Sequence, residues 1–397
     1  MRLLWTTAIT LGVITAAAPA AGSELLAAIE HAHRAGQIDR VERLAYRIAA
    51  VRAPATLPAW LRPEGATALE PASVGSHTQV MVEAFQSLPT LSPAEELKLR
   101  NLLAPPPDLT YSVEATEPYP MRVSYGSPGL QAKAERVLQA AITSYELQVQ
   151  DWGFWEPPIE DGLGSYRFYV MDAGGAAGYT APYLEVDTTD HYDSYTYIVI
   201  DPSLGDVSLD ATVAHEFNHA CQTAMDVGEL RSFMENTASY IEAKVFPSSA
   251  PLMAGMFPYF QNQPFRSIEY MRTYETDGYE YGGALWALFL THHYGDDDPR
   301  WLREVWEGSV QSSWHNEPDY FDALDELLAS DGGVREAMHT FAEHRFFVGA
   351  DDDGHHLPHA GNWHGAEVWR TATVDQTRLP IQDAGPSGTD TQPEPGG

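Results

Sequence analysis

The sequence predicts an α+β protein in which a sheet-forming segment precedes a mainly helical one. Runs rich in aromatic and β-branched residues, bounded by Gly, Asp and Pro, predict strands at residues 119–126, 165–172 and 195–201. Helical periodicity dominates the chain after residue 201, and it also marks a separate region before residue 108. Because the strands come before the C-terminal run of helices, the order favours the α+β class.

The first twenty residues have the three-part layout of a secretory signal peptide. Arg2 precedes an apolar run from Leu3 to Ile14, and residues 18–20 form a small-x-small cleavage site, Ala-Pro-Ala. The apolar run is too short to span a membrane, and no later segment is long and apolar enough. We therefore expect a soluble protein without a membrane span, secreted or periplasmic after cleavage.

Residues 21–107 are predicted to form an N-terminal helical region. Apolar residues recur at helical spacing on both sides of Gly36, and a further helix begins at Ser92 and stops at three prolines. Loops bearing Pro and Gly are expected between these helical pieces. The region is either a permanent wrap on the following domain or a removable propeptide.

The main domain is predicted to cover residues 108–375. It begins with the strands and a long amphipathic helix at residues 130–154, and it ends with the C-terminal helices. Residues 376–397 are polar and rich in Pro and Gly, which predicts a disordered tail.

Charge and cysteine content restrict the possible partners. The chain has 23 Lys and Arg against 56 Asp and Glu, a formal net charge of −33. This balance disfavours binding to nucleic acid or to anionic membranes, since phosphates need clustered basic side chains. Cys221 is the only cysteine, so an intrachain disulfide is excluded.

One short motif indicates metal chemistry. The stretch TVAHEFNHACQ, from Thr212 to Gln222, places His215 and His219 about 40° apart around a helix and about 6 Å apart along it. Two imidazoles so placed can converge on one ion. Glu216 lies beside them, in position to act as the general base toward water at that ion.

The next predicted helix supplies a third ligand. In LRSFMENTASYIEAKVFP, Glu235 lies on one stripe with Ala238, Ser239 and Glu242. The small residues indicate close packing against another helix, which fits less well with the alternative of a solvated face. Two histidines and one carboxylate, with an open fourth position, are typical of a catalytic zinc site, and one Zn²⁺ is expected.

These residues carry a family resemblance. The pattern HEFNH…MENTASYIE resembles the gluzincin metallopeptidases, and the whole layout resembles secreted metalloproteases of myxobacteria. The resemblance implies that Glu235 is the third zinc ligand and that Glu242 accepts a hydrogen bond from a ligating imidazole. It also implies a gluzincin-like catalytic domain. The segment YEYGGALWALFL is similar to the Tyr-Glu-x-Gly segment of the family, which assigns the oxyanion-stabilising role to Tyr279, with Tyr281 as the competitor.

One departure from the family pattern bears on the reaction. The exopeptidases of this family keep a Gly-x-Met-Glu-Asn stretch before the histidines, and the nearest counterpart here is DAGGAAGYTAPY, residues 172–183. We therefore expect a secreted zinc endopeptidase acting on protein or peptide substrates. The alternatives are an aminopeptidase, a zinc hydrolase of another bond, and a non-proteolytic zinc-retaining protein of the cell surface.

Two weaker patterns are further candidates for metal sites. Calcium is conceivable at Asp187, Asp190 and Asp193, but the EF-hand pattern with its central glycine is missing. A second group is rich in histidine but matches no defined motif, and a solvated loop is the favoured interpretation. Its histidines are His355, His356, His359 and His364.

Overall fold

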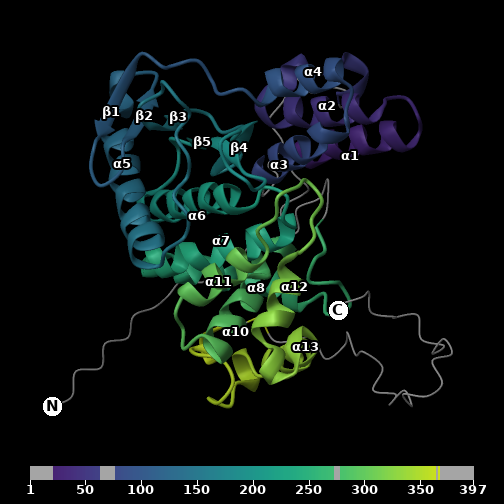
Figure 1. The fold of residues 1–397 in the computed structure, drawn as a ribbon, viewed down its shortest axis with the longest axis vertical. Helices are drawn as coiled ribbons and strands as arrows, with labels where there is room; N and C mark the ends of the chain where they lie inside the picture. Colours follow the sequence, from purple (N-terminus) through teal and green to yellow (C-terminus); the bar gives the residue numbers. More distant parts are fainter. Residues whose placement is uncertain (1–20, 63–76, 272–277, 364, 367–397) are drawn as a thin grey trace.

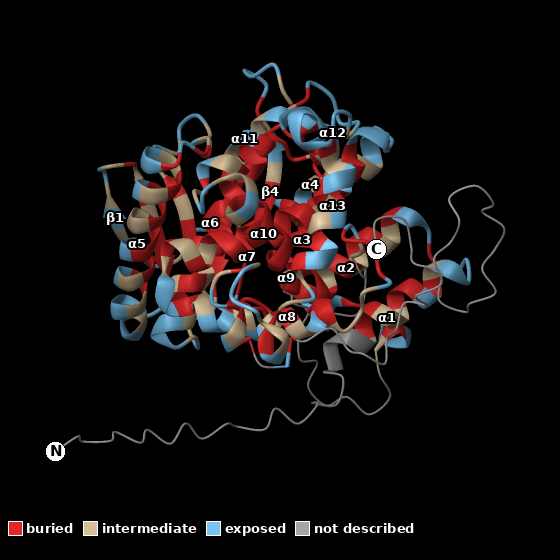
Figure 2. Ribbon diagram, turned by 90° about the horizontal axis from the view of Figure 1, so that it is seen from below, coloured by how far each residue is buried: buried red, intermediate tan, exposed pale blue. Residues whose placement is uncertain are grey.

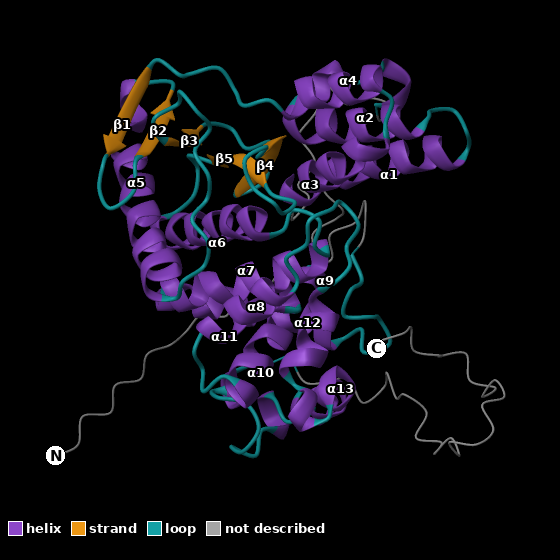
Figure 3. Ribbon diagram, in the orientation of Figure 1, coloured by secondary structure: helices purple, strands orange, loops and turns teal. Residues whose placement is uncertain are grey.

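The computed structural model describes residues 21–62, 77–271, 278–363 and 365–366. The predicted signal peptide, the predicted tail and His364 lie outside the described residues. The predicted α+β class is confirmed: a mixed five-stranded sheet is surrounded by helices (Figures 1 and 3). No helix within these described ranges is long and apolar enough to cross a membrane.

The sheet has the strand order β1-β2-β3-β5-β4. The pairs β2/β3 and β3/β5 are parallel, whereas β1/β2 and β4/β5 are antiparallel. The strands are β1 (Tyr111–Ala115), β2 (Met121–Tyr125), β3 (Tyr166–Val170), β4 (Gly178–Glu185) and β5 (Ser194–Ile200). The sequence predicted β2, β3 and β5 but neither edge strand. In β4, Pro182 is tolerated because it lies on an edge strand next to a register shift.

Helices precede, cross and follow the sheet (Figure 1). The N-terminal helices are α1 (Ala21–Arg34), α2 (Arg40–Arg52), α3 (His77–Ser87) and α4 (Pro93–Leu103). Two helices cover the sheet, α5 (Gln131–Tyr145), extended by a π-helical turn (Glu146–Asp151), and α6 (Asp206–Met225). The remaining helices are α7 (Arg231–Val245), α8 (Ala250–Gln261), α9 (Tyr279–Gly282), α10 (Ala284–Tyr294), α11 (Arg300–Gly308), α12 (Tyr320–Leu327) and α13 (Gly333–His344).

One face of the sheet is covered by α5 and α6. Alternate strand residues such as Phe168, Ile198 and Ile200 point into a core that continues through α6 into the C-terminal helices. Figure 2 shows this core as the buried centre of the molecule, around α6, α7 and α10. Cys221 is buried in it as a free thiol.

The opposite face of the sheet is covered by the N-terminal helices. Tyr169, Tyr197 and Val199, which alternate with the residues of the first core, pack in one cluster with apolar side chains of α1 to α4. The expectation of loops between the two predicted helical pieces was wrong in one part, because α3 forms there and lies against β4 (Figure 1). The range His77–Ser87 contains neither Pro nor Gly, and its apolar residues recur at helical spacing.

Candidate metal centre

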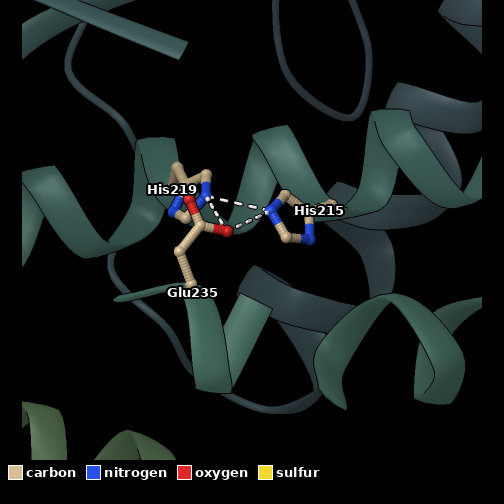
Figure 4. Close-up of side chains that lie close together, drawn as sticks. All are labelled: His215, His219 and Glu235. Atoms are coloured by element: carbon tan, nitrogen blue, oxygen red, sulfur yellow. Dashed lines mark hydrogen bonds and ion pairs between the residues drawn. The ribbon is translucent and has the colours of Figure 1, made fainter. Parts of the chain in front are cut away.

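Helices α6 and α7 bring three potential ligands together in a fully packed region. His215 and His219 lie one turn apart on α6, and Glu235 faces them from α7 (Figure 4). The Nε2 atoms of the two histidines are 3.0 Å apart. The Glu235 Oε2 atom is 3.1 Å from Nε2 of His215 and 3.6 Å from Nε2 of His219. This buried group can hold a metal ion.

The second ring nitrogen of each histidine has its own partner. His215 Nδ1 donates to Glu242 Oε2 at 3.1 Å, as the resemblance implied for Glu242. His219 Nδ1 donates to Gln222 Oε1 at 2.7 Å, while the Gln222 amide donates to Thr237 Oγ1, among other acceptors. When both rings are neutral with their protons at Nδ1, both Nε2 atoms direct lone pairs toward the common centre.

The electrostatics of the group favour a positive charge. Burial alone would raise the pKa of the Glu235 carboxyl, but the neighbouring histidines hold that pKa well below its usual range. Burial likewise opposes protonation of His215, yet hydrogen bonds to Glu235 and Glu242 raise its pKa well above its usual value. The pKa of Glu242 itself is raised, mainly by burial. The carboxyl groups of Glu235 and Glu242, together with the two imidazoles, therefore stabilise a cation at this point, either a proton or a metal ion.

Glu216 lies beside the ligands on the wall of a cavity of about 380 Å³. Its Oε2 atom accepts a hydrogen bond from Thr78 Oγ1 at 3.0 Å. The Thr180 hydroxyl lies 2.8 Å from the same Oε2 atom and 2.7 Å from the backbone carbonyl oxygen of Glu216, so its one proton is shared between these two acceptors. His215 also lines the cavity, whereas His219 and Glu235 are fully buried behind it. A group bound at the histidines is therefore reached from the cavity past His215 and Glu216.

The structure brings Tyr281, and not Tyr279, to this cavity. Tyr281 lines the wall, with its ring centroid 5.9 Å from that of His215. Tyr279 is buried, and its hydroxyl donates to the carbonyl oxygens of Arg266 and Ser267 at 3.1 and 2.9 Å. Two residues apart on one helical turn, the two side chains point about 200° apart, so only one can face the site.

Two glycines allow this turn to approach the site. A Cβ atom at Gly282 would lie 2.6 Å from the carbonyl oxygen of Met256 on α8. A Cβ atom at Gly283 would lie 2.0 Å from the side-chain amide of Asn236 on α7. Any larger residue at either position would push α9 away, so the Tyr-Gly-Gly sequence sets the distance of Tyr281 from the ligands.

Three residues of the site were not identified from the sequence. Thr78 and Gln79, from the first turn of α3, contact Glu216 and Glu235, and Thr180 reaches Glu216 from β4. No local motif marks them. The helical spacing of apolar residues in α3 predicts a buried helix. It does not predict that this helix contacts Glu216 and Glu235.

The two weaker sequence patterns form no comparable group. Asp190 is fully exposed, while Asp193 accepts a hydrogen bond from Thr189, and within the described part of the chain these aspartates do not gather with Asp187 as an ion site. In the histidine-rich stretch, His355 and His359 are exposed, whereas His356 is partly buried, pairs with Asp353 and stacks on Phe347.

Comparison with known proteins adds no assignment. No model of a known protein family matches this chain, and no curated protein matches it significantly. The function is therefore inferred from the geometry of the site and from the sequence motif.

Proposed function

We propose that this protein is an exported, zinc-dependent metallopeptidase of the gluzincin type that cleaves internal bonds of protein or peptide substrates. The observation that carries the proposal is the convergence of His215, His219 and Glu235 next to a carboxylate, Glu216, that lines a cavity. A purely zinc-retaining protein would not need a base at that position.

The separations of the ligand atoms support zinc. Four-coordinate zinc holds nitrogen and oxygen ligands at about 2.0–2.2 Å, which places neighbouring ligand atoms of a tetrahedron about 3.3–3.6 Å apart. The three separations here, 3.0, 3.1 and 3.6 Å, are close to that spacing. Two imidazoles and one carboxylate leave a fourth position for water, as in catalytic zinc sites.

The residues around the site take complementary roles in this proposal. Bound zinc would supply Lewis-acid activation of the scissile carbonyl and of water. Glu216 takes the proton of the attacking water and passes it to the leaving amine. Tyr281 replaces Tyr279 as the donor to the developing oxyanion, because Tyr281 lies at the cavity. Glu242 holds the ring of His215 in place.

The cavity wall favours an endopeptidase with a preference for apolar side chains. Leu252, Met253 and Met256 line it on the side of α8. Among the wall residues that the structure describes, the carboxylates are Glu216 and Glu242. Both have roles at the metal ligands, which leaves no described carboxylate to hold the free amine of an exopeptidase substrate.

Zinc content and casein hydrolysis of the purified chain 21–397, with and without a chelator, test this proposal. We expect close to one zinc per chain and hydrolysis that stops on chelation and returns with added zinc. Zinc bound at that ratio without hydrolysis of casein or short peptides would indicate the non-proteolytic alternative. Hydrolysis that survives complete zinc removal would contradict the proposal.

A further inference from the structure

The first turn of α3 is inserted between the sheet edge and the metal-ligand helices. Its side chains His77, Thr78 and Gln79 are almost completely buried, although they belong to the N-terminal region. His77 Nε2 is 2.9 Å from the carbonyl oxygen of Gly174, which precedes β4. Farther along α3, the Gln86 side-chain amide donates to the carbonyl oxygens of Val227 and Glu229, in the connection between α6 and α7.

Thr78 contacts the proposed general base directly. Its hydroxyl accepts the backbone N–H of Thr180 at 3.0 Å, which orients its own proton toward Glu216 Oε2, also at 3.0 Å. The Thr180 hydroxyl lies 2.8 Å from the same oxygen. The Thr180 hydroxyl is also 2.7 Å from the backbone carbonyl oxygen of Glu216, so Thr78 is the hydroxyl that donates to the carboxylate alone. The other carboxylate oxygen accepts no hydrogen bond within the described residues. This arrangement fixes the orientation of the carboxylate at the cavity wall.

Gln79 performs the equivalent function for the carboxylate ligand. Its side-chain amide donates to Glu235 Oε1 at 3.0 Å, whereas Oε2 faces the two histidines. One oxygen of Glu235 is therefore presented to the metal centre, and the other is held from the opposite side. Hydrogen bonds of this kind to ligating carboxylates set ligand orientation and metal affinity.

We propose that Thr78 and Gln79 are positioning residues of the metal centre, so that the N-terminal helices are part of the working site and not a removable cover. This inference rests on the proposed zinc peptidase function. Thr78 orients Glu216 for proton transfer, and Gln79 fixes Glu235 for metal binding. The two substitutions should therefore affect different quantities.

The test compares variants of the full chain 21–397. Thr78→Val and Gln79→Leu keep the side-chain shape but remove the hydrogen bonds to Glu216 and Glu235. Thr78→Ser restores the hydroxyl. Gln86→Leu is the matched control, because it removes hydrogen bonds that dock the same helix without touching a site residue. Zinc affinity is measured by chelator competition, turnover by peptide hydrolysis, and stability by thermal unfolding.

We expect a clear separation between the two residues. Thr78→Val should keep zinc affinity within about twofold and lower kcat about 10–100-fold, with little change in KM. Thr78→Ser, which keeps the hydroxyl, should have a kcat close to that of the wild type. Gln79→Leu should weaken zinc binding about 10–100-fold. Gln86→Leu should lower the unfolding temperature but leave zinc affinity and kcat nearly unchanged. If Thr78→Val does not fold, Thr78→Ala removes the hydroxyl without adding bulk.

Two results would overturn the inference. Higher activity in Thr78→Val would mean that α3 obstructs the site, and equal zinc affinities for Gln79→Leu and the wild type would remove the role of Gln79. Failure of the proposed function looks different, since wild-type protein would then bind zinc without hydrolysing peptides. In that case the zinc affinities of Gln79→Leu and Gln86→Leu still decide whether Gln79 positions Glu235.

Discussion

The two faces of the sheet are covered by layers that contribute differently to the site. On one face, α5 and α6 pack on Phe168, Ile198 and Ile200, and α6 carries both histidines. On the other face, α1 to α4 pack on Tyr169, Tyr197 and Val199. The first layer supplies two of the candidate metal ligands, and the second supplies hydrogen-bond donors to Glu216 and Glu235.

This difference indicates how the N-terminal helices are integrated. Their apolar core is continuous with the sheet, because the strand residues of the second face are as deeply buried as those of the first. Charged contacts add to this: Glu83 on α3 pairs with Arg43 and Arg47 on α2 and with Arg231, the first residue of α7. A removable propeptide would leave this surface open, which favours the permanent wrap.

The largest expected effect comes from separating the two layers. Cutting the chain at a protease site introduced after Pro107 should leave both fragments together on native size exclusion, with zinc retained. A chain beginning at Asp108 should be insoluble or lack a cooperative thermal transition, because the sheet face around Tyr169 and Tyr197 becomes exposed. Loss of the N-terminal fragment with equal or higher activity of the remainder would identify a propeptide instead.

Removing one candidate ligand on α6 should lower the zinc affinity of the protein. His219→Ala deletes a fully buried imidazole at the centre of the group. We expect zinc affinity to fall by more than about 100-fold, beyond the cost of losing a supporting hydrogen bond. Metal analysis after dialysis checks this, with His339→Ala, an exposed histidine on α13, as the control. Undiminished zinc in His219→Ala would refute the site.

Glu83→Gln tests the charged contacts of the N-terminal layer. The pKa of Glu83 is lowered from 4.5 to about 2: burial would raise it, but Arg231, Arg47 and Arg43 outweigh burial. A carboxyl with a lowered pKa stabilises the fold above pH 4.5, and this contribution is lost as pH falls through 2. Urea unfolding at pH 7 should show a loss of about 3 kcal/mol.

The pH dependence and a matched substitution sharpen that test. The difference between Glu83→Gln and the wild type should shrink steadily as the pH is lowered from 4.5 toward 2. Glu96→Gln removes a more exposed pair with Arg100, and it should cost less than about 1 kcal/mol. Equal effects of the two substitutions at pH 7 would show that the buried ion pairs of Glu83 do not stabilise the packing of the N-terminal helices.

Substitution of Glu229, in the connection between α6 and α7, should have the opposite effect on stability to substitution of Glu83. Burial raises the pKa of this carboxyl from 4.5 to about 7. A carboxyl with a raised pKa stabilises the fold below pH 4.5, and this contribution is lost as pH rises through 7. Glu229→Gln should therefore increase the free energy of unfolding by about 1–2 kcal/mol at pH 8 and give no gain at pH 4. A loss of stability at pH 8 would contradict this assignment.

The candidate ligands could be found in the sequence because their spacing is local. His215, Glu216 and His219 fall within five residues of one helix, and Glu235 follows after a short connection. The tyrosine could not be decided from the sequence, because the orientation of Tyr281 depends on how α9 packs against α7 and α8.

The contacts of the α3 residues could not be predicted from the sequence for a different reason. Thr78 lies 138 residues from Glu216 in the chain, and Gln79 lies 156 residues from Glu235. Neither threonine nor glutamine at a helix start is a signal by itself, and their role arises only when the second layer packs on the sheet. For the same reason, strand β4 with its Pro182 could be recognised only as an edge strand of the assembled sheet.

The most direct test of the account is a paired measurement on Glu216→Gln. Glu216 contacts Thr78 and Thr180 and lines the cavity, but it is not among the three converging ligands. The variant should therefore bind close to one zinc per chain, with wild-type affinity, while kcat for peptide hydrolysis falls by about 10²–10⁴. Near-normal hydrolysis with zinc in place would contradict the role of Glu216 as the base. Loss of zinc would show that it acts as a ligand instead.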